Sequence, residues 1–197
     1  QSLAFAPDGR LLVAGTDRGG VRVWTLDEPS APTPRAELDT GRGAVRAVDV
    51  SPDGRWLAAG ADDGRVHLWA LPDGLDGEGA TTLLGVPGPK LLSLAFDATG
   101  ERLATGDMDG RLRLWDLAAE QPEPVTLDTV GGRVLAVGFD ARGERLAATT
   151  LHGLRLWDLS DPTDPELLLS GKGHGERVMA VATSPDGALI ASGDGDG

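Results

Sequence analysis

The sequence predicts an all-β chain that repeats one four-stranded sheet, and three observations support this fold class. First, one phrase with a PDG-like turn occurs five times, and its turn glycines are spaced by 45, 46, 43 and 44 residues: Gly9, Gly54, Gly100, Gly143 and Gly187. Second, an alternating run ends in tryptophan 15 residues after the first three of these glycines and 14 after the fourth, at Trp24, Trp69, Trp115 and Trp157. Third, no helical period competes with this pattern.

Each repeat indicates four antiparallel strands. Runs such as VRAVDV and VLAVGF precede the PDG-like turn, and Asp-Gly or Gly-Gly turns follow the second run. Asp-Gly between alternating runs is a strong hairpin signal, because both central residues of a type I′ turn need a positive φ. A weaker fourth strand follows each tryptophan after a Pro-rich loop. Four such strands repeated radially make the blades of a β-propeller, which we expect over 1–40, 44–85, 90–129 and 133–170, with a partial blade over 177–197.

The chain resembles the WD-repeat propellers. The repeat of about 44 residues ends its third strand in tryptophan, and the dipeptide WD itself stands at Trp115-Asp116 and Trp157-Asp158. Gly173-His174, four residues before Val178, is similar to the Gly-His opening phrase of that family. The resemblance covers essentially the whole chain and is specific for the fold. It is much less specific for function, because one fold hosts many activities.

The resemblance also implies a network of hydrogen bonds within a blade, which links a histidine, a second-strand serine or threonine, a turn aspartate and the tryptophan. The residues that match this pattern are Asp63 and Trp69, then Thr105, Asp109 and Trp115, and finally His174, Ser192 and Asp196. We expect them to hold the fold. Arg18 stands at the aspartate position of the first repeat, and the fourth repeat is one residue short near His152. Irregular turns are therefore expected in these two blades.

Four complete repeats are followed by half of a fifth. An open arc of blades would expose strand edges and the apolar faces of its terminal blades. We therefore expect these residues to be an excerpt of a longer, closed propeller. The alternative is an arc that a partner chain closes, for example a second copy.

Composition excludes several classes of protein. Hydrophobic residues make up 40% of the chain, which is enough for a core, and the absence of cysteine removes disulfides and thiolate sites. No stretch approaches the roughly 18 apolar residues of a membrane span, and no signal-peptide pattern opens the chain. The net charge of −13 argues against nucleic acid as a partner. We expect a cytoplasmic protein that binds neither membrane nor nucleic acid, and the abundance of Ala, Gly, Asp and Arg indicates a bacterial source.

Almost all of the net charge lies in the loops that join third to fourth strands. The segments 25–34, 70–79, 116–124 and 158–166 contain 2, 3, 3 and 4 acidic residues and no Lys or Arg, which accounts for −12 of the −13. The family resemblance implies that these loops share one face of a disc. This acidic face is either a solvated rim or a docking face for a basic partner.

The opposite, top face is the candidate binding site. Its loops, 40–46, 85–90, 129–133 and 171–177, sum to a charge of +5. The resemblance implies that residues at the start of each first strand and in the second-to-third turns ring the channel mouth and contact peptides. These residues are Arg46, Leu92, Leu135 and Met179, the neighbouring Lys90, Arg133 and Arg177, and the turn residues Asp62 and Met108. An apolar ring beside basic residues would suit an acidic, hydrophobic segment. Inner-strand packing is the alternative for the three apolar residues, whereas a buried, unpaired Arg46 would be costly.

The residue pattern does not indicate catalysis. His67 occupies a strand position that holds arginine in the other repeats, so we interpret it as structural. His174, Ser192 and Asp196 resemble a Ser-His-Asp set, but the repeat explains all three as fold-holding residues. The Asp-x-Asp-Gly stretches at 107–110 and 194–197 are similar to the start of calcium loops, yet they lack the later acidic ligands. We therefore expect no enzyme activity, no metal and no cofactor.

Three functions are compatible with these observations. The favoured one is a non-catalytic scaffold that binds a protein or peptide on its top face, as part of a larger multidomain protein. A regulatory propeller that controls a neighbouring effector domain of the same chain is the first alternative. A propeller enzyme is the second, and the inner strands argue against it because they offer mainly Ala, Val, Leu, Phe and Ser.

Overall fold

The structure, a computed structural model, describes residues 2–28, 30–41, 43–71, 75, 82–85, 87–129, 132–171, 174, 177–184, 186 and 188–195. Within these ranges the chain forms eighteen β-strands and no α-helix. It divides into two compact units, Gln1–Leu91 and Leu92–Gly197. The expectation of an all-β chain is confirmed.

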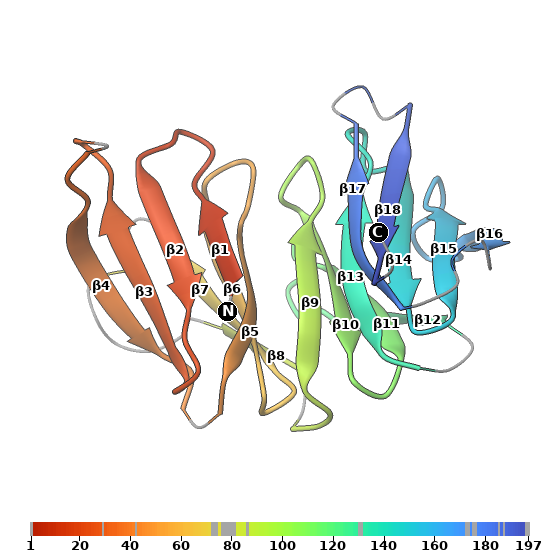
Figure 1. Cartoon of the computed structure of the whole chain (residues 1–197), viewed down its shortest axis with the longest axis horizontal. Coiled ribbons are helices and arrows are strands. Elements are labelled where there is room, and N and C mark those ends of the chain that lie inside the picture. Colours follow the sequence, from red (N-terminus) through yellow and green to blue (C-terminus); the bar gives the residue numbers. More distant parts are fainter. Residues whose placement is uncertain are drawn as a thin grey trace. The chain divides into compact units, whose positions relative to one another are not determined.

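The first unit contains two four-stranded antiparallel sheets (Figure 1). The first blade has the strand order β1-β2-β3-β4: β1 Ser2–Phe5, β2 Leu11–Gly15, β3 Gly20–Thr25 and β4 Thr33–Asp39. The second blade has the order β5-β6-β7-β8: β5 Val45–Val50, β6 Trp56–Ala61, β7 Val66–Ala70 and β8 Thr82–Leu84. Neighbouring strands are consecutive in the chain, so each blade is a simple meander.

The second unit repeats this arrangement, with the third blade beginning at the boundary between the units. The third blade contains β9 Leu91–Phe96, β10 Arg102–Asp107, β11 Arg111–Asp116 and β12 Val125–Asp128. The fourth blade contains β13 Val134–Phe139, β14 Arg145–Thr150, β15 Gly153–Asp158 and β16 Glu166–Gly171. A two-stranded sheet follows, β17 Val178–Thr183 with β18 Ile190–Asp194.

The core of each unit lies where one sheet packs against the next. In the first unit, Val13 and Val23 of the first blade share a buried cluster with Val48, Val50 and Trp69 of the second. A matching cluster in the second unit joins Leu112 and Leu114 to Phe139, Leu146 and Trp157. Consecutive residues of the second strands β6, β10 and β14 are buried, and because successive side chains point to opposite faces, both faces of these sheets are covered.

The turn between the first and second strands shows why the SPDG phrase recurs. In the second blade Gly54 adopts φ 72°, which favours glycine, and its amide donates to the Ser51 carbonyl at 2.8 Å. The Asp53 carboxylate accepts from the Ser51 hydroxyl at 2.6 Å and from the Arg55 amide at 2.9 Å. Burial alone would raise the pKa of Asp53, but these bonds and the Arg55 guanidinium outweigh it and lower the pKa below its ordinary value.

Candidate protein-interaction site

The first strands of three sheets contain a β-bulge near their start. The register of β5 against β6 shifts between Val45 and Ala47. Equivalent shifts occur between Val134 and Ala136 in β13 and between Val178 and Ala180 in β17. The bulged residues are Arg46, Leu135 and Met179. A bulge leaves one residue out of the ladder and re-aims its side chain, so three residues of the expected top face share a special backbone position.

Each blade has two distinct edges, which follow from the meander topology. At one edge the first strand begins and the second-to-third turn lies; we call it the bulged edge. At the other edge lie the first-to-second turn and the third-to-fourth loop; we call it the acidic edge. The bulged edge contains all nine residues that the sequence proposes for partner binding.

In the first unit, the bulged edge carries a three-residue charge cluster. Asp62, in the β6–β7 turn, accepts hydrogen bonds from the Arg46 guanidinium, one of them from Nη2 at 3.2 Å. Lys90 Nζ lies 2.8 Å from the same carboxylate. The hydrogen bond from Arg46, followed by that from Lys90, lowers the pKa of Asp62 despite partial burial. Asp62 therefore partly neutralises the two cations, which the charge pattern of the loops did not reveal.

In the second unit, the bulged edge is apolar and basic. Met179 is 55% exposed, while Leu135 and Leu92 are half-buried. Met108, in the β10–β11 turn, is also half-buried. Part of each apolar side chain is thus accessible, and β17 packs beside β13 so that Leu135 and Met179 lie on neighbouring strands.

Two cations accompany these apolar residues. Arg133 and Arg177 directly precede β13 and β17, and both are exposed. Within the described part of the chain neither forms a salt bridge. Their guanidinium groups are therefore available to an incoming carboxylate.

The expected network around the tryptophan is present in part in the third blade. Trp115 Nε1 donates to Thr105 Oγ1 at 3.0 Å, and both residues are buried. The aspartate that is buried beside this pair is Asp107. Its carboxylate pairs with Arg113 at 3.0 Å and accepts hydrogen bonds from the backbone amides of Asp109 and Arg111. Asp109, which the family pattern proposes, is exposed. The turn places Asp107 inward because it is the last residue of β10 and Asp109 lies in the turn beyond it.

The second blade uses a different arrangement. His67 Nε2 lies 3.1 Å from Asp63 Oδ2, and its ring stacks on Trp69 with centroids 6.2 Å apart. Trp69 Nε1 is buried without a hydrogen-bond partner among the described residues, contrary to the network expected from the sequence. The physical reason is that Ala59 occupies the position of Thr105 and offers no hydroxyl.

His174 contacts both a hydroxyl and a carboxylate. Its Nε2 lies 2.7 Å from Ser192 Oγ, and its Nδ1 lies 3.1 Å from Asp194 Oδ2. Asp196, the expected carboxylate, lies outside the described residues. Ser192 and Asp194 are the repeat equivalents of Thr105 and Asp107, which have structural contacts in the third blade. The repeat therefore accounts for this constellation without a reaction.

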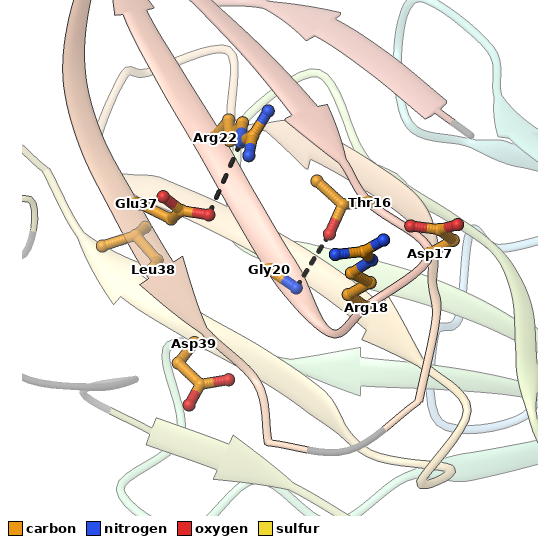
Figure 2. A pocket seen from close by; sticks show the side chains of 8 residues that line it. All are labelled: Thr16, Asp17, Arg18, Gly20, Arg22, Glu37, Leu38 and Asp39. Carbon is orange, nitrogen blue, oxygen red and sulfur yellow. Dashed lines mark hydrogen bonds and ion pairs between the residues drawn. The ribbon is translucent and has the colours of Figure 1, made fainter.

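Arg18 belongs to a pocket of about 750 Å³ in the first blade. Figure 2 shows it with Arg22, Glu37, Asp17 and Asp39 around the turn that joins β2 to β3. Arg22 pairs with Glu37 at 3.5 Å, and both side chains are exposed. Three carboxylates and two guanidinium groups line this pocket, so its charges largely offset one another.

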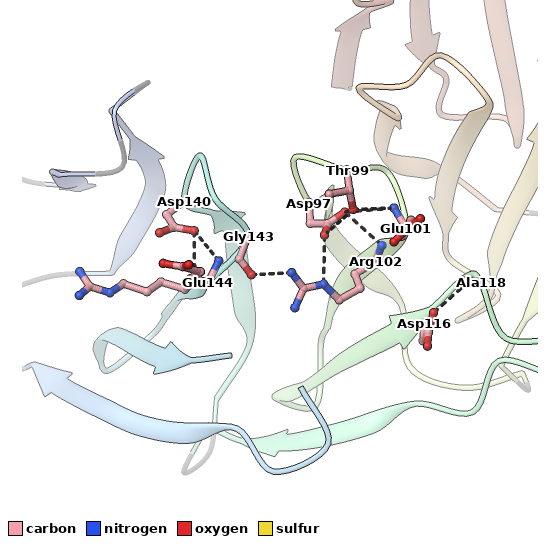
Figure 3. Close-up of polar contacts among 10 residues, drawn as sticks. Asp97, Thr99, Glu101, Arg102, Asp116, Ala118, Asp140, Gly143 and Glu144 are labelled. Carbon is pink, nitrogen blue, oxygen red and sulfur yellow. Dashed lines mark hydrogen bonds and ion pairs between the residues drawn. The ribbon is translucent and has the colours of Figure 1, made fainter. Parts of the chain in front are cut away.

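A buried ion pair that sequence reasoning missed joins the third and fourth blades at the acidic edge. Asp97 is buried and accepts Arg102 Nε at 3.0 Å (Figure 3). The Arg102 guanidinium also donates to the Gly143 carbonyl at 2.6 Å and lies 5.9 Å from the centre of the Phe139 ring. The signal was the aspartate that begins DATG at a position where the second repeat has the serine of SPDG.

Neither a metal centre nor a membrane helix is found in the part of the chain that the structure describes. No group of three or more His, Asp or Glu residues is arranged there to hold a metal ion. No helix there is long and apolar enough to cross a membrane.

Comparisons with known proteins agree with the repeat pattern. The family model described as "WD domain, G-beta repeat" matches residues 1–25, 33–70, 81–116 and 165–197. Striatin-4 of Homo sapiens is 28% identical over 137 residues, and Striatin-4 of Mus musculus is 29% identical over 137 residues. These alignments cover 62% of this chain but only 18% of either relative.

A solved structure shows the same fold. The crystal structure of the β-propeller domain of Cps50 (Swd1) from Myceliophteria thermophila matches 99% of this chain and 62% of its own, with a TM-score of 0.84 and 19% identity. The expected β-propeller fold is thereby confirmed. These relatives are eukaryotic, so the expectation of a bacterial source stays a prediction.

Proposed function

Because the chain belongs to the WD40 repeat family, whose propellers are generally protein-interaction scaffolds, we propose that it binds an acidic, partly apolar segment of a partner protein at the bulged edge. The binding residues are placed in the second unit: Arg133, Leu135, Arg177 and Met179, with Leu92 and Met108 beside them. The role is non-catalytic. Within the first unit, Arg46, Asp62 and Lys90 form a separate, mixed-charge cluster.

The observation that carries this proposal is the bulge at Leu135 and Met179. A bulge leaves its extra residue unpaired in the ladder and re-aims its side chain, which allows that side chain to serve a surface contact. Met179 exposes 55% of its surface although methionine is an apolar residue. An exposed thioether next to two unpaired arginines suits a segment that combines carboxylates with apolar side chains.

Rigid strands favour such binding energetically. The bulged residues are anchored in sheets, and a hydrogen bond from Thr183 Oγ1 to the Phe139 carbonyl, at 2.7 Å, ties β17 to β13. Residues that strands already hold in place lose little conformational entropy when a partner binds, so the free-energy cost of binding is smaller. The arginines would add long-range attraction for an acidic segment.

A selection from a random peptide library tests the proposal. We expect the selected peptides to be rich in Asp, Glu and apolar residues. The double variant Arg133→Glu with Arg177→Glu is expected to bind them at least about tenfold more weakly, because two attractive contacts become repulsive. The fold should be unaffected, since both side chains are exposed and form no salt bridge among the described residues.

The matched control carries the same charge change at the opposite edge. Arg10→Glu with Arg142→Glu alters two exposed arginines in first-to-second turns. This control should keep the affinity of the unchanged chain within about twofold. Equal affinities for both double variants, with unchanged circular dichroism, would show that the bulged edge is not the binding site.

A further inference from the structure

A cavity of about 620 Å³ lies on the acidic edge, wholly within the second unit. It opens between the third-to-fourth loop of the third blade and the corresponding loop of the fourth blade. Its apolar lining consists of the buried Leu114, the half-buried Val125 and the exposed Ala118, Ala119 and Pro162. The volume is within the range of about 300–1,000 Å³ that is common for ligand pockets.

The rim of the cavity carries negative charge that forms no salt bridge among the residues that the structure describes. Three exposed carboxylates line it, those of Glu101, Asp116 and Glu123. One cation, Arg102, is among the residues that line the cavity. Its guanidinium group forms a salt bridge with the buried Asp97 and donates a hydrogen bond to the Gly143 carbonyl (Figure 3). Arg102 therefore neutralises Asp97 and leaves the three rim carboxylates for an external cation.

We propose that this cavity binds an arginine side chain from a basic segment of a partner protein. An arginine combines an aliphatic stem with a planar, charged fork, so the stem fits the apolar lining while the guanidinium reaches the rim. Paired N–H groups match carboxylate oxygens better than a single ammonium group does. Lysine would make a weaker version of the same contact.

The surrounding charge supports this choice of partner. The two third-to-fourth loops of the second unit, 116–124 and 158–166, carry seven acidic residues and no Lys or Arg. In the fourth-blade loop that borders the cavity, a hydrogen bond from the Thr163 hydroxyl lowers the pKa of Asp161, which keeps this carboxylate ionised. The resulting field attracts a basic segment and repels an acidic one. This site is therefore separate from the bulged edge and complementary to it in charge.

The test uses N-acetyl-arginine methylamide as the probe and the citrulline analogue as its neutral isostere. We would titrate each into the ¹⁵N-labelled chain and follow the amide signals of Ala118, Ala119 and Gln121, which line the cavity. The arginine probe is expected to cause saturable shifts at millimolar concentration, while the citrulline probe binds at least about fivefold more weakly.

A pair of variants then localises the effect. Glu101→Gln with Glu123→Gln should weaken arginine binding about fivefold or more, while Asp27→Asn with Glu28→Gln, in the first-blade loop, should leave it unchanged. All four positions are exposed, so the fold is expected to survive. Equal binding of citrulline, an unchanged affinity in the cavity variant, or shifts of similar size throughout the loop 25–34 would overturn the proposal.

Discussion

The second and third blades have the same topology but support their tryptophans differently. In the third blade a buried hydroxyl accepts the indole N–H of Trp115. In the second blade the indole of Trp69 has no such partner among the described residues, and a histidine stacks on it instead. Burying an indole of about 150–250 Å² at about 25 cal/mol per Å² contributes roughly 4–6 kcal/mol. An unsatisfied buried donor costs about 1–3 kcal/mol, so apolar burial alone can hold Trp69 in place.

The bulged edges of the same two blades differ even more. Arg46 and Asp62 form an ion pair in the second blade, and the equivalent positions of the third blade hold Leu92 and Met108. The turn glycines and the tryptophans recur from blade to blade, whereas these two positions change from an ion pair to apolar side chains. The same edge can therefore present different chemistry in different blades.

The largest expected difference between the two blades is in the unfolding free energy that is lost when a carboxylate near the second-to-third turn is removed. Asp107 is fully buried and holds Arg113, whereas the Asp63 side chain is 26% exposed. Replacing Asp107 by alanine should cost about 2–4 kcal/mol of unfolding free energy, because a half-buried guanidinium and two amides lose their acceptor. Asp63→Ala should cost about 1 kcal/mol. Urea denaturation measures both, and equal losses would contradict the difference in burial.

The next effect is the loss of the indole acceptor in the third blade. Thr105→Val keeps the shape of the side chain but leaves Trp115 Nε1 without a partner. We expect the free energy of unfolding to fall by about 1–3 kcal/mol. Thr126→Val, at an exposed position of β12, is the control and should change it by less than about 0.5 kcal/mol. If the two variants unfold alike, the hydroxyl does not support the indole.

A smaller effect of opposite sign is expected in the second blade. Ala59→Ser should supply the missing acceptor to Trp69 and raise the free energy of unfolding by about 0.5–1.5 kcal/mol. Ala58 is equally buried but its side chain points to the other face of the sheet, so Ala58→Ser should destabilise the chain. Thermal denaturation of the pair checks the prediction, and a loss in both variants would argue against it.

The smallest effect concerns the ion pair at the bulged edge. Because Arg46 lowers the pKa of Asp62, the pair stabilises the fold above the ordinary aspartate pKa of about 3.9, and this contribution is lost as the pH falls through the lowered pKa. Arg46→Met should raise the pKa of Asp62 towards its ordinary value. Titration of the carboxyl ¹³C signal measures this change. An unchanged pKa would mean that Lys90 alone holds the carboxylate.

The periodic part of the structure could be predicted from the sequence. The spacing of turn glycines and tryptophans located the strands, for example β11, which ends one residue after Trp115. Four of the five residues of the expected fourth-strand run AELDT, at positions 36–40, lie in β4, which ends at Asp39. These predictions succeed because alternation and turn chemistry are local properties.

Contacts that depend on strand register or on the packing of neighbouring blades could not be predicted from the sequence. The alternating pattern along the strands could not show that Asp107 is buried and Asp109 is exposed. Which of the two turns inward depends on the residue at which β10 ends. The bond from Arg102 to the Gly143 carbonyl joins two residues that lie 41 positions apart, in different repeats. The bulges at Arg46, Leu135 and Met179 were equally invisible, although the sequence did single out these residues.

The most direct test of the proposed function is to map a selected acidic peptide onto the ¹⁵N-labelled chain by its amide chemical-shift changes. We predict that the largest changes occur at Arg133, Leu135, Arg177 and Met179, and that the Trp115 indole signal stays in place. Changes centred on the first-to-second turns or on the third-to-fourth loops would contradict the placement of binding at the bulged edge.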